Sequence, residues 1–168
     1  MARLCVKSWW NGDYRYYINL TPNPLQEAVL RTDLSSNVHI EGGRRSGRTT
    51  AVVMRSIQWV VERDMDVLIV GVPSFLMPFA IYNLLVSITP DRVRHMWNTT
   101  KPKGGGKTVW SHCLGGSITA MSVGAGRVRG HYHAILIDNS DLYSPEAKAV
   151  VASYSSYGVL QGLVVEDT

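Results

Sequence analysis

The stretch that decides the fold is residues 42–50, which read Gly-Gly-Arg-Arg-Ser-Gly-Arg-Thr-Thr. They follow the phosphate-loop pattern of glycine, four free positions, glycine, lysine and then serine or threonine, except that Arg48 stands at the lysine position. Gly42, Gly43 and Gly47 allow backbone conformations that a side chain would forbid, so that successive N–H groups can point at a phosphate. The sequence therefore predicts a phosphate-binding loop with an unusual residue at the position that usually carries its charge.

The residues on either side of the loop favour a nucleotide site. Residues 37–41 predict a short strand before the loop, and residues 49–60 predict a helix whose N-terminus would face a bound anion. The hydroxyl of Thr49 would bind Mg2+. A surface turn rich in glycine and arginine that merely binds anions is the alternative. The predicted nucleotide-binding positions in the loop are Gly42, Gly43, Arg44, Arg45, Ser46, Gly47, Arg48, Thr49 and Thr50.

The arginine at position 48 keeps the positive charge of the usual lysine but not its shape. A guanidinium is planar and bulkier than an ammonium, and it donates hydrogen bonds as a fork. Arg48 could still clamp phosphate oxygens, and Arg44 or Arg45 within the loop could take over the missing role. We therefore count all three arginines as candidate catalytic residues.

The length and composition of the chain indicate a single domain. A chain of 168 residues that is 45% hydrophobic can bury a substantial core. Residues 1–20 form an N-terminal extension to it. The net charge of +4 favours contact with polyanions, although weakly. Cys5 and Cys113 form no metal-binding or disulfide pattern, and the first residues lack the apolar run of a secretory signal, so we expect a reducing, intracellular setting.

Residues 67–90 contain no charged residue and are long enough to span a bilayer. Pro73 and Pro78 argue against one spanning helix. The stretch divides better into a buried strand over 67–72 and a helix over 76–86 that covers a sheet. We therefore expect no contact with a membrane.

The remaining sequence continues the alternation of strands and helices. Residues 101–107 predict a flexible basic loop, and 108–112 and 117–122 predict a hairpin around Gly115 and Gly116. Further along we expect a strand over 133–138, a short helix over 145–153 and a last strand over 159–165. This order predicts an α/β fold with a mostly parallel sheet.

The apolar run Ile135-Leu136-Ile137-Asp138 carries the second chemical motif. A buried parallel strand there would deliver Asp138 to the edge of the sheet beside the phosphate loop, where its carboxylate could hold Mg2+. An aspartate that merely ends a strand is the ordinary alternative. The pair of motifs resembles P-loop ATPases with an extra strand between them, in which the residue after this aspartate is usually a glutamate that activates the attacking water. Here that residue is Asn139, whose amide can orient a water but cannot accept its proton. Hydrolysis should therefore be slow unless another carboxylate, such as Asp141, substitutes.

Together these motifs resemble the ATPase domain of the large terminase subunit, the motor that packages phage DNA. The resemblance implies a P-loop NTPase fold, a three-layer α/β/α sandwich of the additional-strand type, that uses ATP and Mg2+. It also implies that Gln26, in the segment 21–26, contacts adenine. The hairpin and the pair Arg129-Gly130 match the segment that precedes the acidic strand in terminases. The resemblance implies that Arg129, or alternatively Arg127, reaches the nucleotide of a neighbouring subunit.

The resemblance further implies partners and a place of action. We expect double-stranded DNA, a homo-oligomeric ring on a capsid portal, a small terminase subunit, and the cytoplasm of the infected host cell. Terminases continue into a nuclease domain that the 168 residues do not contain. Three explanations stay open: a split gene with a separate nuclease subunit, a truncated remnant, or a fragment of a longer protein. Two alternatives remain open: a catalytically impaired accessory protein that binds nucleotide or DNA, and the first domain of a superfamily-two helicase.

Overall fold

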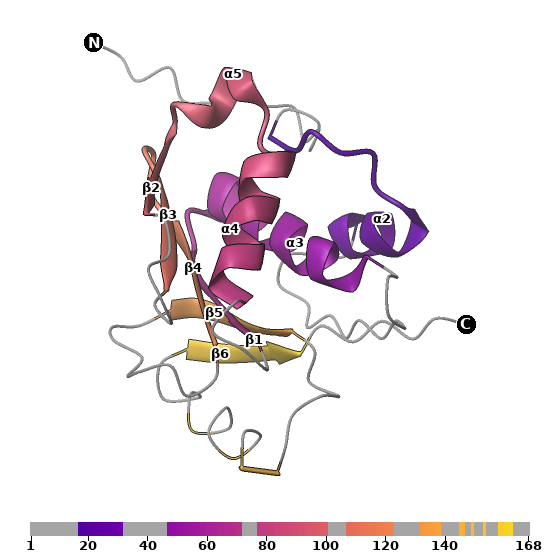
Figure 1. Cartoon of the computed structure of the whole chain (residues 1–168), viewed down its shortest axis with the longest axis vertical. Helices are drawn as coiled ribbons and strands as arrows, with labels where there is room; N and C mark the ends of the chain where they lie inside the picture. Colours follow the sequence, from indigo (N-terminus) through magenta and orange to yellow (C-terminus); the bar gives the residue numbers. More distant parts are fainter. Residues whose placement is uncertain are drawn as a thin grey trace.

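The computed structural model describes residues 17–31, 47–71, 77–100, 107–122, 132–138, 145–146, 149, 153 and 158–162. In this part of the chain the helices come mostly in the first half and the strands mostly in the second (Figure 1). In order they are α2 (Pro24–Arg31), α3 (Arg48–Arg63), β1 (Asp66–Gly71), α4 (Met77–Ile88), α5 (Asp91–Arg94), β2 (Trp97–Thr100), β3 (Thr108–His112), β4 (Ser117–Ser122), β5 (Tyr132–Asp138) and β6 (Gly158–Gly162).

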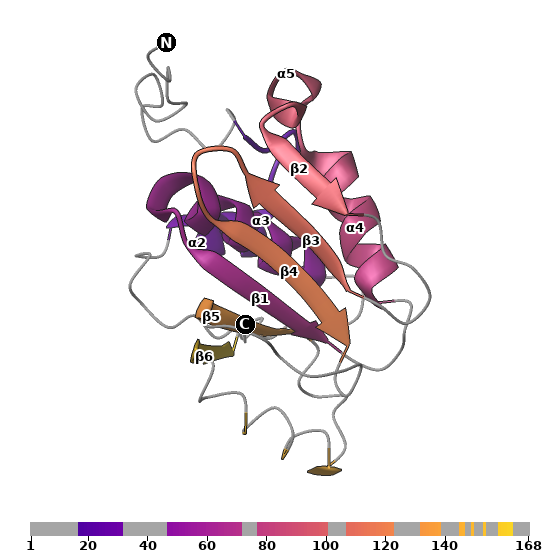
Figure 2. The ribbon, with the colours of Figure 1, turned by 90° about the vertical axis from the view of Figure 1, so that its left-hand side faces the viewer.

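The strands form one sheet in the order β2-β3-β4-β1-β5-β6 (Figure 2). The four strands β4, β1, β5 and β6 are parallel, whereas β3 runs antiparallel to both β4 and β2. Leu68 of β1 lies between Thr119 of β4 and Ile135 of β5. The predicted α/β fold with a mostly parallel sheet is therefore confirmed.

The middle strand β1 is buried on both faces, as its unbroken apolar sequence predicts. Val67 and Ile69 join the hydrophobic core beneath the helices. Successive side chains of a strand alternate between the faces, so Leu68 and Val70 point the other way, and they too are fully buried. Both faces of β1 are thus covered, as the middle strand of a three-layer sandwich requires.

The helix α3 confirms the helix predicted over 49–60 and extends it to Arg63. It packs against β1, β4 and β5, and beside α4 on the same face of the sheet (Figure 1). The chain turns at Asp64, whose left-handed backbone (φ 55) ends the helix, and β1 begins two residues later. The last turn of α3 therefore lies at the amino end of β1, and its first turn lies at the opposite end of this layer.

The hairpin predicted around Gly115 and Gly116 is confirmed by the antiparallel pair β3 and β4. Gly116 has a left-handed backbone (φ 86) and lies so close to the link between α3 and β1 that a Cβ there would be 2.8 Å from the main-chain oxygen of Met65. Only glycine fits this crossing without strain. The turn of the hairpin is thereby seated against the end of α3.

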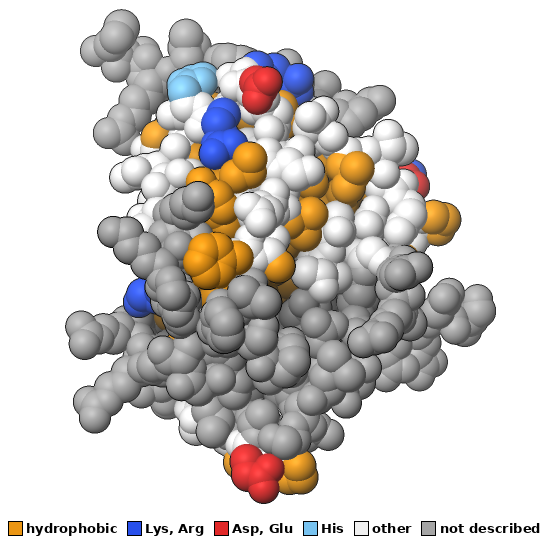
Figure 3. All heavy atoms as spheres, in the orientation of Figure 1, with side chains coloured by type: hydrophobic (Ala, Val, Ile, Leu, Met, Phe, Trp, Pro, Cys, Tyr) orange, Lys and Arg blue, Asp and Glu red, His pale blue; other side chains and the backbone are white. Residues whose placement is uncertain are grey.

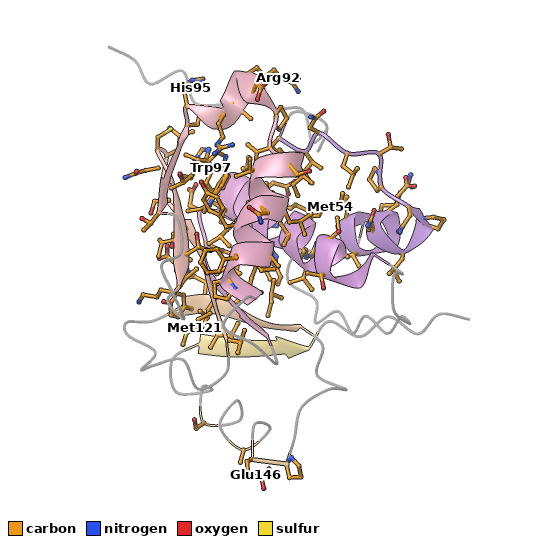
Figure 4. The ribbon with its side chains drawn as sticks, viewed as in Figure 1. Met54, Arg92, His95, Trp97, Met121 and Glu146 are labelled. Carbon is orange, nitrogen blue, oxygen red and sulfur yellow. The ribbon has the colours of Figure 1, made fainter. Side chains whose placement is uncertain are left out.

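The strand β2 and the short helix α5 are additions that the sequence did not predict. Trp97 of β2 packs on Trp110 of β3, with ring centroids 5.9 Å apart, and its side chain lies in the layer between the sheet and α4 (Figure 4). Arg94 places its guanidinium over the Trp110 ring at 4.8 Å. These contacts join α5 to the edge of the sheet through aromatic packing.

The uncharged stretch 67–90 contains β1 and α4, as predicted, with α4 over Met77–Ile88 instead of 76–86. Hydrophobic side chains are visible on the outer surface of α4 (Figure 3), and Val86 is 36% exposed. Across the described ranges, none of the helices has the length and apolar character needed to cross a membrane.

Other predicted elements are met only in part. The last strand occupies Gly158–Gly162, whereas the prediction was 159–165, and 163–165 lie outside the described residues. The predicted strand 37–41 and the loop 101–106 lie outside them entirely, as does most of the predicted helix 145–153.

Candidate functional site

The first turn of α3 presents the end of the glycine-rich motif. Gly47 is the N-cap of the helix and has a left-handed backbone, with φ 83 and ψ 18. Arg48 is the first helical residue, and Thr49 and Thr50 follow it at half-exposed positions. The first N–H groups of a helix have no partner within the helix, and they carry the positive end of its dipole. The predicted order of glycine, cation and hydroxyl thus occurs where an anion would be bound most favourably.

Gln26 lies directly against this turn, although it is 21 residues away in the sequence. Its Nε2 donates a hydrogen bond of 3.3 Å to the carbonyl oxygen of Gly47. Its Oε1 accepts a hydrogen bond of 2.9 Å from the main-chain N–H of Asn23. The side chain is 5% exposed. The structure therefore brings Gln26 and Gly47 together, as a shared nucleotide site requires.

Asp138 is the last residue of β5, beside Gly71, the last residue of β1. The parallel strands end at the same edge of the sheet, where open α/β folds bind ligands. In Figure 1 the arrow of β6 points toward the side on which α2 lies, and α2 contacts α3. Asp138 thus ends a parallel strand, as predicted, and its role toward Mg2+ stays a prediction.

Several predicted site residues lie outside the described part of the chain. They are Gly42, Gly43, Arg44, Arg45, Ser46, Arg129 and Asn139, together with the alternatives Arg127 and Asp141. Their roles remain predictions.

Side chains of α3 hold the C-terminal end of α2. Arg55 is fully buried, and its Nη1 donates to the carbonyl oxygen of Val29 at 3.3 Å and to Oε1 of Gln58 at 2.9 Å. Gln58 donates from Nε2 to the carbonyl oxygen of Leu30 at 2.9 Å. Carbonyls at a helix end have no intrahelical partner, so these bonds replace water as α2 is buried. The guanidinium also lies 4.9 Å from the centre of the Trp59 ring.

A second polar contact attaches the segment before α2 to the same helix. The hydroxyl of Tyr17 donates a hydrogen bond of 2.8 Å to Oε1 of Glu62. Burial raises the pKa of the Glu62 carboxyl above its ordinary value of 4.5. Hydrogen bonds from Tyr17 and Gln58, and the nearby charges of Arg55 and Arg63, lower the pKa but do not cancel the effect of burial. Sequence patterns do not show which residues of a helix face another segment of the chain. The contacts of Arg55, Gln58 and Glu62 therefore could not be found from the sequence.

Among the described residues, no group of three or more His, Cys, Asp and Glu side chains could hold a metal ion. His133 at the start of β5 accepts a hydrogen bond from the main-chain N–H of Asp66 at 2.9 Å. This contact joins the two neighbouring strands β1 and β5.

Comparisons by sequence and by fold give different results. No family model and no curated protein matches the sequence. Solved structures of phage large terminases do match the fold. The ATPase domain of the large terminase of Thermus phage P74-26 is 12% identical, with a TM-score of 0.55 over 88% of this chain and 67% of that one. The large terminase of bacteriophage HK97 is 13% identical, with a TM-score of 0.65 over 90% of this chain and 36% of that one.

The described part of the chain is thus an α/β domain with a mostly parallel sheet, in which α3 begins at Arg48, directly after the glycine-rich sequence. In particular, it has the fold of the ATPase domain of phage large terminases, as the sequence predicted. It spans about two thirds of the length of the Thermus phage ATPase domain and about one third of the HK97 terminase.

Proposed function

We propose that this chain is the ATP-binding motor domain of a viral DNA-packaging terminase large subunit. The observation that carries the proposal is the meeting of Gln26 with Gly47 at the first turn of α3, in a terminase-like fold whose acidic strand ends at Asp138. In this proposal the three separate parts of the sequence that predict nucleotide binding serve one site.

The residues of the loop and strand divide the work of holding ATP and Mg2+. In this proposal residues 42–50 bind the phosphates through main-chain N–H groups, and Arg48, Arg44 and Arg45 supply positive charge. Thr49 and Asp138 hold Mg2+, an oxygen-liganded cation that suits a hydroxyl and a carboxylate. The described residues fit this assignment, because Thr49 is half-exposed in the first helical turn. When bound, Mg2+ supplies charge neutralisation on the phosphates.

The remaining predicted residues act at the ends of the nucleotide. Gln26 contacts adenine, and an amide suits this role because it can both donate to N7 and accept from the amino group of the base. Arg129 acts on the nucleotide of a neighbouring subunit, where its guanidinium stabilises charge on the transferring phosphoryl group. Asn139 orients the attacking water without taking its proton, so turnover is slow in the isolated domain.

The proposal includes the partners that such a motor needs. They are double-stranded DNA, further copies of the chain in a ring on a capsid portal, a small terminase subunit and a nuclease that acts on the same DNA. The motor works in the cytoplasm of the infected cell. DNA and ring assembly are expected to raise hydrolysis, because assembly delivers Arg129 to its neighbour's site.

Isothermal titration calorimetry with ATP, in the presence of Mg2+ or of EDTA, tests the proposal. The wild-type chain should bind ATP more tightly with Mg2+. Asp138→Asn should weaken that binding about tenfold, the loss of one charged ligand, and should leave binding in EDTA nearly unchanged. Ser87→Ala, at an exposed position on α4, is the matched control and should bind like wild type. The absence of any binding at millimolar ATP would refute the proposal.

A nucleotide- or DNA-binding accessory protein without turnover is the second candidate. Asn139 favours it, because the water-activating position lacks a carboxylate. The variant Asn139→Glu separates the two candidates. A large gain in ATP turnover would show that the site is otherwise intact. If the double variant Arg48→Lys and Asn139→Glu binds ATP but stays inert with DNA present, the accessory function is the correct one.

A further inference from the structure

We propose that Asn23 and Gln26 are positioning residues that hold the peptide group between Gly47 and Arg48 in a fixed orientation. This orientation strengthens phosphate binding whether or not Gln26 also contacts a base. The inference rests on the proposed nucleotide-binding function. It concerns the pair of carboxamides that packs against Gly47.

The two residues form a reciprocal cap at the start of α2. Oδ1 of Asn23 accepts from the main-chain N–H of Gln26 at 2.8 Å, and Oε1 of Gln26 accepts from the main-chain N–H of Asn23 at 2.9 Å. Pro24 between them has no N–H to satisfy, which suits the first helical position. This is the capping-box arrangement, in which each side chain fixes the rotamer of the other. The carboxamide of Gln26 is therefore held before any ligand arrives.

Asn23 and Gln26 also pack against Gly47. The remaining polar atom of the Gln26 amide, Nε2, donates to the Gly47 carbonyl at 3.3 Å. A Cβ on Gly47 would lie 2.5 Å from that Nε2 and 2.8 Å from Nδ2 of Asn23, so both carboxamides lie against its Cα. Both carboxamides can approach this closely only because Gly47 has no side chain.

The hydrogen bond from Gln26 to the Gly47 carbonyl also fixes the N–H at the other end of the same peptide group. A peptide group is planar and trans, so fixing the Gly47 carbonyl also fixes the N–H of Arg48, which points in the opposite direction. That N–H is among those with which a phosphate loop binds its anion. The same carbonyl accepts the first bond of α3, from the N–H of Ala51 at 2.9 Å. The side chain of Gln26 thus sets both the first turn of α3 and the direction of a phosphate-binding N–H.

Gln26 can keep this role while it contacts a base. An amide nitrogen carries two hydrogens and an amide oxygen two lone pairs, and the contacts with Asn23 and Gly47 use one of each. The prediction that separates positioning from base recognition concerns a ligand that has no base. Inorganic tripolyphosphate carries the phosphate chain of ATP and nothing else.

The test measures the binding of Mg-tripolyphosphate and of Mg-ATP by calorimetry to the wild type and to Gln26→Glu. The carboxylate keeps an oxygen for the N–H of Asn23 but sets its other oxygen against the Gly47 carbonyl, so a bond becomes a repulsion. We expect tripolyphosphate to bind about tenfold more weakly and ATP to lose at least as much, because ATP also loses the contact between the amide and its base. Unchanged tripolyphosphate binding with weakened ATP binding would overturn the proposal and leave Gln26 as a base contact only.

Two further variants separate positioning from a loss of folding. Asn23→Asp keeps the oxygen that caps α2 and should bind tripolyphosphate within about twofold of wild type, whereas Asn23→Ala should lose about tenfold. Leu30→Ala destabilises the buried far end of α2 without touching Gly47, and its folded form should bind both ligands normally. A tenfold loss in Leu30→Ala would refute the positioning role. A wild-type chain that binds neither ligand would instead refute the proposed function, and the positioning role with it.

Discussion

Gly116→Ala and Gly47→Ala form a matched pair of perturbations. Both glycines have a left-handed backbone, and at both an added Cβ would meet another atom closer than 3.0 Å. At Gly116 the nearest atom is the main-chain oxygen of Met65, at 2.8 Å, whereas at Gly47 it is Nε2 of Gln26, at 2.5 Å. A side-chain amide can rotate away from a methyl group. The main chain of Met65 cannot move without shifting the start of β1.

The magnitudes follow from these neighbours. A left-handed backbone costs alanine about 1–2 kcal/mol at either position. At Gly116 the clash with main chain adds about 1–3 kcal/mol of overpacking, and at Gly47 the displaced amide of Gln26 loses a hydrogen bond of about 1 kcal/mol. We therefore expect the free energy of unfolding to fall by about 4 kcal/mol in Gly116→Ala and by about 2–3 kcal/mol in Gly47→Ala.

Urea denaturation followed by circular dichroism measures both losses, and calorimetry with tripolyphosphate measures the effect on the site. Only Gly47→Ala should weaken tripolyphosphate binding, because Gly116 lies at the far end of α3. A loss below about 0.5 kcal/mol in Gly116→Ala, which is typical of a neutral surface change, would refute the steric reasoning. Equal loss of binding in both variants would show that the site responds to global stability alone.

Three further predictions concern the polar contacts of the helices. Burial raises the pKa of Glu62, so the free energy of unfolding should fall as the pH rises above 4.5 through the raised pKa, and Glu62→Gln should remove that slope in urea titrations at several pH values. Arg55→Ala should lower the free energy of unfolding by about 3 kcal/mol, because it removes the buried donor to the Val29 carbonyl of α2 and to Oε1 of Gln58, and Arg55→Lys should lose less. Arg94→Ala should cost only about 0.5–1 kcal/mol in the same assay, since it removes one half-exposed cation from the face of Trp110, and a loss as large as that of Arg55→Ala would contradict this ranking.

The sequence was most informative where one signal dominated. The apolar run around Leu68, closed by Pro73, favours a buried strand over a membrane span, and Gly115-Gly116 between alternating residues favours a turn. The predicted bounds of β1 and of the hairpin therefore agree with the structure within one residue. The strand β2 was not predicted because only Trp97 among its four residues is apolar and buried, so the sequence shows no alternation of apolar and polar residues there. A short edge strand of this kind is defined by its partner strand.

The helix α2 was missed for a different reason. Its start carries a readable signal, since Asn23, Pro24 and Gln26 match the pattern of a capped first turn. The same residues therefore indicate the start of a helix as well as a base contact by Gln26. Its contact with Gly47 could not be predicted, because a hydrogen bond across 21 residues depends on how two helices pack. The burial of Arg55 was beyond sequence reasoning for the same reason.

The central place of β1 has a consequence for the way the chain folds during synthesis. Its partners are distant, since Asp66 pairs with Ser117 and Val67 with Ala134, separations of 51 and 67 residues. Until residues 132–138 leave the ribosome, one edge of the most apolar strand has no neighbour. Non-local pairing of this kind is slow, and exposed strand edges aggregate. A nascent chain halted between β4 and β5 should therefore depend on chaperones, and the completed sheet should not.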